Sequence, residues 1–157
     1  MNLLLETSGL LKLLLREEFS PLAQEAFSRA EALAASAFAL PEAVGVLHAM
    51  RRDGRLSRIG YRKALKELYG LWDYLEVLTP TLEGHVRAAQ LCEKHPLKGA
   101  DALHLVAALY LREFRQEVVL LTFDRTLYHA AKREGLAAKR EGLAVVPVPA
   151  LEPPGAG

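Results

Sequence analysis

Four acidic residues stand where a predicted strand ends or a predicted helix begins. Glu6 closes a short apolar run and Asp124 follows another, while Glu42 and Asp101 each lie at the start of a predicted helix. An acid in such a place has a simple structural explanation, because it caps free backbone amides and interacts favourably with the helix dipole. The chain has only 4 Asp against 15 Glu, so two aspartates in this kind of position call for a second explanation.

Helix capping explains Asp101 and Glu6 poorly. Asp101 leads into the helical run 102–110, which is apolar nearly all round, and Glu6 ends a buried strand. An unpaired carboxylate at such a surface is costly. No basic partners for the four acids stand nearby in sequence, whereas a hard divalent cation with oxygen ligands would remove their repulsion. Such an ion activates water and neutralises phosphate charge, which is the chemistry of phosphodiester cleavage. The rival interpretation is a structural domain in which the acids serve only as caps.

Alternating strands and helices are expected to position these acids. Apolar and β-branched runs predict strands at 2–6, 74–78, 118–123 and 143–148, with a further short apolar run at 36–40. Helical patterns cover 8–16, 20–34, 41–52, 57–72, 79–95 and 100–110, and another helix follows Asp124. This alternation predicts a parallel sheet between helices, with its site beyond the carboxyl ends of the strands. Glu6 and Asp124 should therefore lie at the same edge.

The composition narrows the class of protein. A length of 157 residues fits one domain, and 51% hydrophobic residues supply a real core. The net charge of +1 gives no global attraction to nucleic acid or membrane. A single cysteine, Cys92, excludes a disulfide framework. No signal peptide and no membrane span are expected, so the expected location is the cytoplasm. The scarcity of Asn and Gln suggests a heat-adapted source (a thermophile), or a GC-rich genome.

Four sequence segments together resemble a known family. They are Leu5-Glu6-Thr7-Ser8-Gly9-Leu10-Leu11-Lys12, Leu40-Pro41-Glu42, Asp101-Ala102-Leu103-His104-Leu105-Val106-Ala107-Ala108 and Leu121-Thr122-Phe123-Asp124. In order and spacing they look like the four motifs of PIN-domain ribonucleases, and most of all those of the VapC-type toxins of bacterial toxin–antitoxin pairs. The resemblance covers residues 1–149, and the Pro/Gly-rich tail 150–157 is expected to be disordered.

The resemblance implies a PIN-like three-layer α/β/α fold with a central, mostly parallel sheet of four to five strands. It also implies an endoribonuclease that depends on Mg²⁺ or Mn²⁺, forms a homodimer and is silenced by a cognate antitoxin. Glu6 and Asp101 would be the main metal ligands, and Asp124 would complete the cluster or bind a second ion. Glu42 would hold a metal-bound water. Three hydroxyls would orient the carboxylates, those of Thr7, Ser8 and Thr122.

One residue departs from the family pattern. Glu6 stands where the family normally has aspartate, and its extra methylene moves the carboxylate by roughly 1.5 Å. Either the loop adjusts, with slack supplied by Gly9, or metal affinity and rate fall. The alternative function is therefore a catalytically weakened PIN-fold protein that binds antitoxin or RNA.

Residues around the acids suggest further roles. His104, one turn after Asp101, would touch substrate, fix Asp101 or simply pack in its helix. Lys12 and Arg16 flank the first acid and are candidates to contact RNA phosphates. Residues 51–66 have a local net charge of +6, and this segment offers three further candidates, Arg51, Arg52 and Arg55. The rival for that segment is an exposed helix face. Five leucines at 10, 11 and 13–15 exceed one buried face, which suggests an antitoxin groove or dimer surface, or else a fully packed helix.

The heptapeptide AKREGLA occurs twice, at 131–137 and 138–144. A perfect copy is more consistent with a recent duplication than with a functional repeat. We expect the helix after Asp124 to be about two turns longer than the fold needs, with Gly135 inside it. The alternative is a helix that stops at Gly135.

Overall fold

The computed structural model describes residues 1–137 and 144–146, in which helices alternate with parallel strands. The elements are β1 (Asn2–Leu5), α1 (Thr7–Leu14), α2 (Ser20–Arg29), β2 (Ala32–Ser36), α3 (Ala39–Arg52), α4 (Arg58–Trp72), β3 (Glu76–Leu78), α5 (Leu82–Lys94), α6 (Gly99–Phe114), β4 (Val118–Leu121), α7 (Arg125–Ala137) and β5 (Ala144–Val146). The strands lie in the order β3-β2-β1-β4-β5, and each described pair is parallel. The predicted three-layer α/β/α fold with four to five strands is confirmed.

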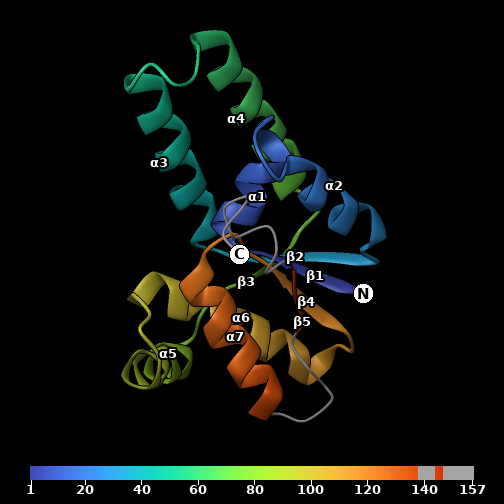
Figure 1. Cartoon of the computed structure of the whole chain (residues 1–157), viewed down its shortest axis with the longest axis vertical. Helices are drawn as coiled ribbons and strands as arrows, with labels where there is room; N and C mark the ends of the chain where they lie inside the picture. The colour runs from blue at the N-terminus through green and yellow to red at the C-terminus, as the bar shows by residue number, and fades with distance from the viewer. Residues whose placement is uncertain (138–143, 147–157) are drawn as a thin grey trace, which may run out of the picture.

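The sheet has a hydrophobic core on each face. Helices α1 to α4 cover one face, while α5, α6 and α7 cover the other (Figure 1). Alternate residues of β1 supply both cores: Leu3 and Leu5 pack with α1 and α3, and Leu4 packs with α6. A strand buried on both faces is apolar throughout, which is why residues 2–5 show no polar alternation.

The strand order places a topological switch point between β1 and β4. The chain moves from β1 outward to β2 and β3, then returns to the other side of β1 to form β4 and β5. Leu5 pairs with Leu121, so the residues that leave these two strands are neighbours at one edge. Ligands of open parallel sheets bind in the crevice at such a point.

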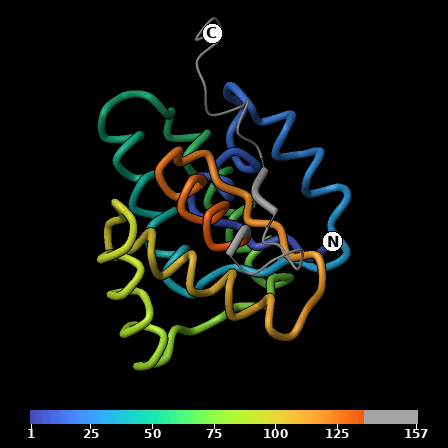
Figure 2. Tube along the Cα trace, turned by 60° about the horizontal axis from the view of Figure 1, so that its bottom comes forward, coloured from blue at the N-terminus to red at the C-terminus, as the bar shows by residue number. Residues whose placement is uncertain are grey.

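The amino end of β1 is tied to the segment that enters β2. The Glu31 N–H donates to the Met1 carbonyl at 2.8 Å, and Figure 2 shows the N-terminus beside this part of the trace. The link fixes the amino ends of the central strands, opposite the edge where Glu6 and Asp124 leave the sheet.

The prediction of a helix over 20–34 was wrong at its end. Helix α2 ends at Arg29, and residues 32–36 form β2. The segment is rich in alanine, which favours helices, but Leu33 pairs in register with Leu3 and the strand is buried beside β1. Tertiary pairing therefore overrides the local preference.

Helix α7 includes Gly135 and runs to Ala137, so it does not stop at the glycine. Most of the second AKREGLA copy lies outside the described residues, as does the tail, and the predicted extra two turns stay a prediction. Within the described ranges, no helix combines the length and apolar character needed to cross a membrane.

Candidate functional site

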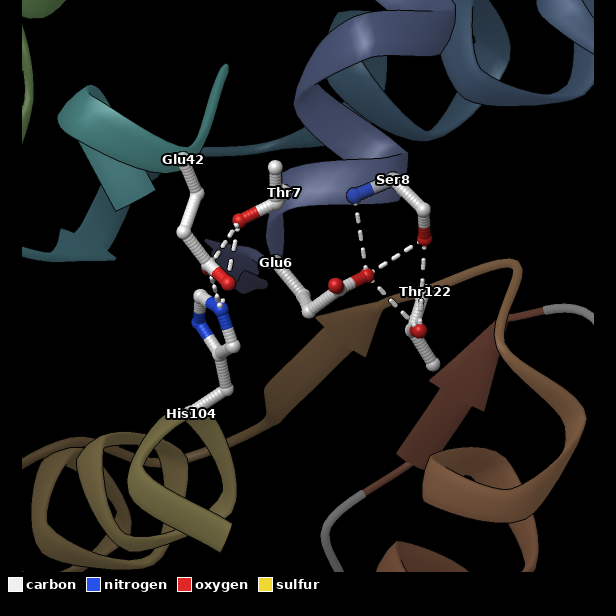
Figure 3. Close-up of polar contacts among 6 residues, drawn as sticks. All are labelled: Glu6, Thr7, Ser8, Glu42, His104 and Thr122. Carbon is white, nitrogen blue, oxygen red and sulfur yellow. Dashed lines mark hydrogen bonds and ion pairs between the residues drawn. The ribbon is translucent and has the colours of Figure 1, made fainter. Parts of the chain in front are cut away.

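Glu6 leaves β1 at the switch point and caps α1. Its Oε2 accepts the N–H of Ser8 at 3.0 Å and the hydroxyl of Thr122 at 2.9 Å, and also the Ser8 hydroxyl (Figure 3). Burial raises the pKa of the Glu6 carboxyl, against the lowering effects of the His104 charge and these hydrogen bonds. In the part of the chain that is described, the other oxygen, Oε1, accepts no hydrogen bond, which leaves it available to a cation.

Glu42 lies in the first turn of α3 and faces α6 across the edge of the sheet. Its Oε1 accepts hydrogen bonds from the Thr7 hydroxyl at 2.7 Å and from His104 Nε2 at 2.8 Å (Figure 3). The hydrogen bond from His104 lowers the pKa of the Glu42 carboxyl more than its partial burial raises it. The basic partner of Glu42 is thus His104, 62 residues away in sequence, which only the fold brings to the acid.

Asp101 and Asp124 are half-buried and approach the same space from α6 and α7. Burial raises the pKa of Asp101, and the negative charges of Asp124 and then Glu42 raise it further. Asp124 also caps α7, since its Oδ1 accepts the N–H of Leu127 at 2.7 Å. Asp124 therefore both caps α7 and contributes a negative charge close to Asp101.

The hydroxyl residues expected to orient the carboxylates all contact one. Thr7 reaches Glu42, and Ser8 and Thr122 reach Glu6. His104 contacts Glu42 and not Asp101, so of its three expected roles the packed and hydrogen-bonded one matches the geometry. Sequence reasoning missed Phe38, whose ring lies 4.3 Å from that of His104 and holds it in place.

The donor set matches a hard divalent cation in chemistry. Its members are carboxylate oxygens, and their charges are close enough to perturb Asp101. Among the residues that the structure describes, however, no three acidic, histidine or cysteine side chains are near enough to hold an ion as they stand. Glu42 is turned toward His104, and Glu6 toward Ser8 and Thr122. The carboxylates therefore fit the ion by type, but the acids must come closer together to hold it.

The predicted cationic residues divide between the site and a distant surface. Lys12 Nζ lies 5.8 Å from the centre of the Phe123 ring, beside Asp124 in sequence, and pairs with Glu17 at 3.1 Å. Arg16 is exposed at the end of α1. Arg51, Arg52 and Arg55 are exposed at the far end of α3, about 14 Å along the helix from Glu42. The structure does not bring those three arginines to the acids.

The leucines of α1 serve two purposes. Leu10 and Leu11 are buried in the core. Leu13, Leu14 and Leu15 are half-exposed and line a groove of about 710 Å³ between α1, α2 and α4. These three leucines are thus partly buried, because they pack against the core and also line the groove.

The fold and the acidic edge agree with what comparison with known proteins shows. The PIN domain model matches residues 3–136, and the chain belongs to the PIN-domain family. A curated relative, ribonuclease VapC45 of Mycobacterium tuberculosis, is 32% identical over 132 residues, which cover 83% of this chain and 89% of that one.

Two solved structures show the same fold. PAE2754 from Pyrobaculum aerophilum has a TM-score of 0.63 at 21% identity and covers 93% of this chain and 84% of its own. A chain of a toxin–antitoxin complex from Klebsiella pneumoniae has a TM-score of 0.58 at 19% identity, with 92% and 95% covered.

Proposed function

We propose that this protein is a divalent-metal-dependent endoribonuclease and the toxin of a VapBC-type toxin–antitoxin pair. The observation that carries the proposal is the partly buried Asp101, whose pKa is raised by burial and by two further carboxylates at the switch point. Helix capping by itself does not explain why these carboxylates lie close enough to repel one another. Membership of the PIN-domain family and the ribonuclease relative support the same activity.

Glu6, Asp101 and Asp124 would hold Mg²⁺ or Mn²⁺, and Glu42 would orient a water molecule. The bound ion would act as a Lewis acid toward the phosphate and the attacking water. Ser8 and Thr122 fix the Glu6 carboxylate, and Thr7 and His104 fix that of Glu42. These side chains keep the acids oriented before the ion arrives, which reduces the reorganisation that binding requires.

The test is RNA cleavage by Asp101→Asn and Asp124→Asn variants. Each variant is expected to lose at least about 100-fold in metal-dependent cleavage rate. That factor is the upper end of the loss caused by mutating a residue that only orients a metal ligand. The chain supplies matched controls, because its other two aspartates, Asp53 and Asp73, are remote caps of α3 and α4. Asp73→Asn should cleave RNA normally and chelator should abolish cleavage. Equal rates for native protein and Asp101→Asn would refute the proposal.

The antitoxin is proposed to occupy the groove beside α1. Leu13 to Leu15 give it an apolar floor, and its rim carries Arg16, Glu17, Lys63 and Glu67. A floor of this kind with charged edges suits the apolar face of a partner helix. The toxin–antitoxin neighbour supports a protein partner.

The homodimer is proposed to form through a different surface. Five exposed apolar side chains gather on β3, α5 and α6, namely Val77, Leu82, Val86, Tyr110 and Phe114. Two of them, Val77 and Tyr110, line a second groove of about 420 Å³. Exposed apolar patches of this kind mark association surfaces.

Two charge substitutions separate these surfaces and act as controls for each other. Leu14→Glu should abolish capture of the small protein encoded upstream of this chain, while leaving the mass measured by light scattering unchanged. Leu82→Glu should lower the mass measured by light scattering from that of a dimer to that of a monomer, and should leave capture of the small protein unchanged. If both variants behave like the native protein in both assays, the assignment of the two surfaces is wrong.

The competing function is a catalytically weakened PIN-fold protein that binds antitoxin or RNA. The Glu6→Asp variant distinguishes it from an active ribonuclease. A large gain in cleavage on shortening this acid would favour a crippled native site. The Ser8 and Thr122 contacts support a site adapted to glutamate, for which Glu6→Asp brings no gain.

A further inference from the structure

Gly9 lies in the first turn of α1, where the helix passes over the carboxyl end of β4. A Cβ built at Gly9 would stand 2.4 Å from the Leu121 carbonyl oxygen and 2.8 Å from Leu121 Cγ. Because the nearer atom belongs to the backbone, rotation of a side chain cannot relieve the contact. The absence of a Cβ at this position is what lets α1 and β4 lie so close together, so Gly9 supplies space rather than the backbone slack expected from the sequence.

The same carbonyl anchors the first acid. The Leu121 carbonyl accepts the backbone N–H of Glu6 at 3.2 Å. On either side of this bond, Thr122 donates to Glu6 Oε2 at 2.9 Å, and Ser8 Oγ accepts the N–H of Phe123 at 2.8 Å. All three hydrogen bonds join the start of α1 to the end of β4.

We propose that Gly9 is a positioning residue for the metal site, because its missing Cβ sets the α1–β4 separation that holds the Glu6 carboxylate against Ser8 and Thr122. This inference rests on the proposed function, in which Glu6 is a metal ligand. A methyl group at residue 9 moves the two elements apart by at least 0.6 Å, from 2.4 Å to 3.0 Å. Hydrogen bonds that are already near 3 Å weaken steeply on that scale.

The first measurement needs neither metal nor RNA. In Gly9→Ala, amide hydrogen exchange at Glu6 and Phe123 should accelerate by at least about 10-fold relative to amides in α5, while unfolding stays cooperative. Gly70→Ala on α4 is the matched control, because nothing lies within 4 Å of its added Cβ. Unchanged exchange at Glu6 and Phe123 would overturn the proposal. So would a Gly9→Ala chain that cannot fold, because the glycine would then serve the core rather than Glu6.

The second measurement links Gly9 to the acid. Calorimetric titration with Mn²⁺ should show affinity lower by about 10–100-fold in Gly9→Ala and unchanged in Gly70→Ala. In a Glu6→Gln background the Gly9→Ala change should add nothing further, since the residue through which it acts is already lost. Additive losses would overturn the proposal.

The two proposals fail in different ways. If the native chain binds no Mn²⁺ and cuts no RNA, the proposed function is wrong, and amide exchange alone decides whether Gly9 positions Glu6. If the native chain binds metal but Gly9→Ala binds it equally well, the proposed function stands and the role of Gly9 is refuted.

Discussion

His104 Nε2 donates a hydrogen bond to Glu42 Oε1 across 2.8 Å and so joins the second turn of α6 to the first turn of α3. The histidine is buried, its ring packs against Phe38, and Nε2 also lies 3.2 Å from the Thr7 hydroxyl. This contact sets the direction of the Glu42 carboxylate. The acid that would orient water is therefore positioned by a residue of another helix.

Removing His104 should slow cleavage through Glu42. His104→Ala frees the carboxylate and leaves the Thr7 hydroxyl as its partner, so we expect a rate loss of about 10–100-fold and a loss of about 1–3 kcal/mol in unfolding free energy. His95→Ala is the matched control, because His95 is also buried and lies 3.0 Å from a glutamate, Glu134, away from the site. The control should lose similar stability and keep its cleavage rate at temperatures where it is folded. Equal rate losses in both variants would contradict a specific role for His104.

Glu6→Gln should stabilise the metal-free protein at neutral pH. Burial raises the pKa of Glu6 in the folded state, so the fold favours the protonated acid. This contribution is fully present below the unfolded pKa and is lost as the pH rises through the folded pKa. An uncharged isostere avoids that loss, and we expect about 1 kcal/mol more unfolding free energy at pH 7 in chelator. The difference should shrink toward pH 4 in denaturant titrations; a variant less stable than native at pH 7 would count against it.

Glu134 should show the opposite pH dependence. Burial raises its pKa, but the hydrogen bonds from Lys94 at 2.8 Å and from His95, together with the charges of these two residues, lower it by more. A depressed carboxyl pKa gives stability that is present above the unfolded pKa and lost as the pH falls through the folded pKa. Glu134→Gln should therefore be less stable by about 1 kcal/mol at pH 7, and equal to native near pH 3. Thermal unfolding at the two pH values measures this, and a constant difference would show that the charge is not involved.

The arginines at the end of the α3–α4 hairpin should affect RNA affinity more than catalysis. Arg51 lies 5.4 Å from the centre of the Tyr61 ring, Arg55 lies 3.7 Å from Asp53, and both arginines are exposed. Arg51→Ala should weaken binding of a long RNA and reduce the slope of log K against log salt by about 1. The cleavage rate at saturating RNA should stay unchanged, because the residue is far from Glu42.

Arg115→Ala supplies the control for the hairpin. Arg115 is similarly exposed and paired, with Glu76 at 3.2 Å, but it stands just before β4, at the amino end of the sheet. Its substitution should leave the salt slope unchanged. An unchanged slope for Arg51→Ala as well would support the rival interpretation of the basic segment as an exposed helix face.

The sequence by itself determined the layered fold and the edge where the acids gather. Apolar runs buried on both faces mark β1 and β4, and parallel strands deliver their next residues to one edge, so Glu6 and Asp124 could be placed together without coordinates. It did not determine β2, because alanine-rich residues 30–36 favour a helix locally. Only pairing with β1 makes them a strand.

Tertiary structure alone decided how each acid is held. The Glu42–His104 hydrogen bond joins residues 62 positions apart, and Thr122 meets Glu6 across 116 positions. The contact of Gly9 with Leu121 likewise depends on how closely α1 approaches β4. Local patterns fix which residues leave a strand or start a helix, since those depend on near neighbours. Side-chain partners depend on the packing of elements that are distant in sequence, and so do differences of less than an ångström in the spacing between elements. Only the folded chain brings those elements together.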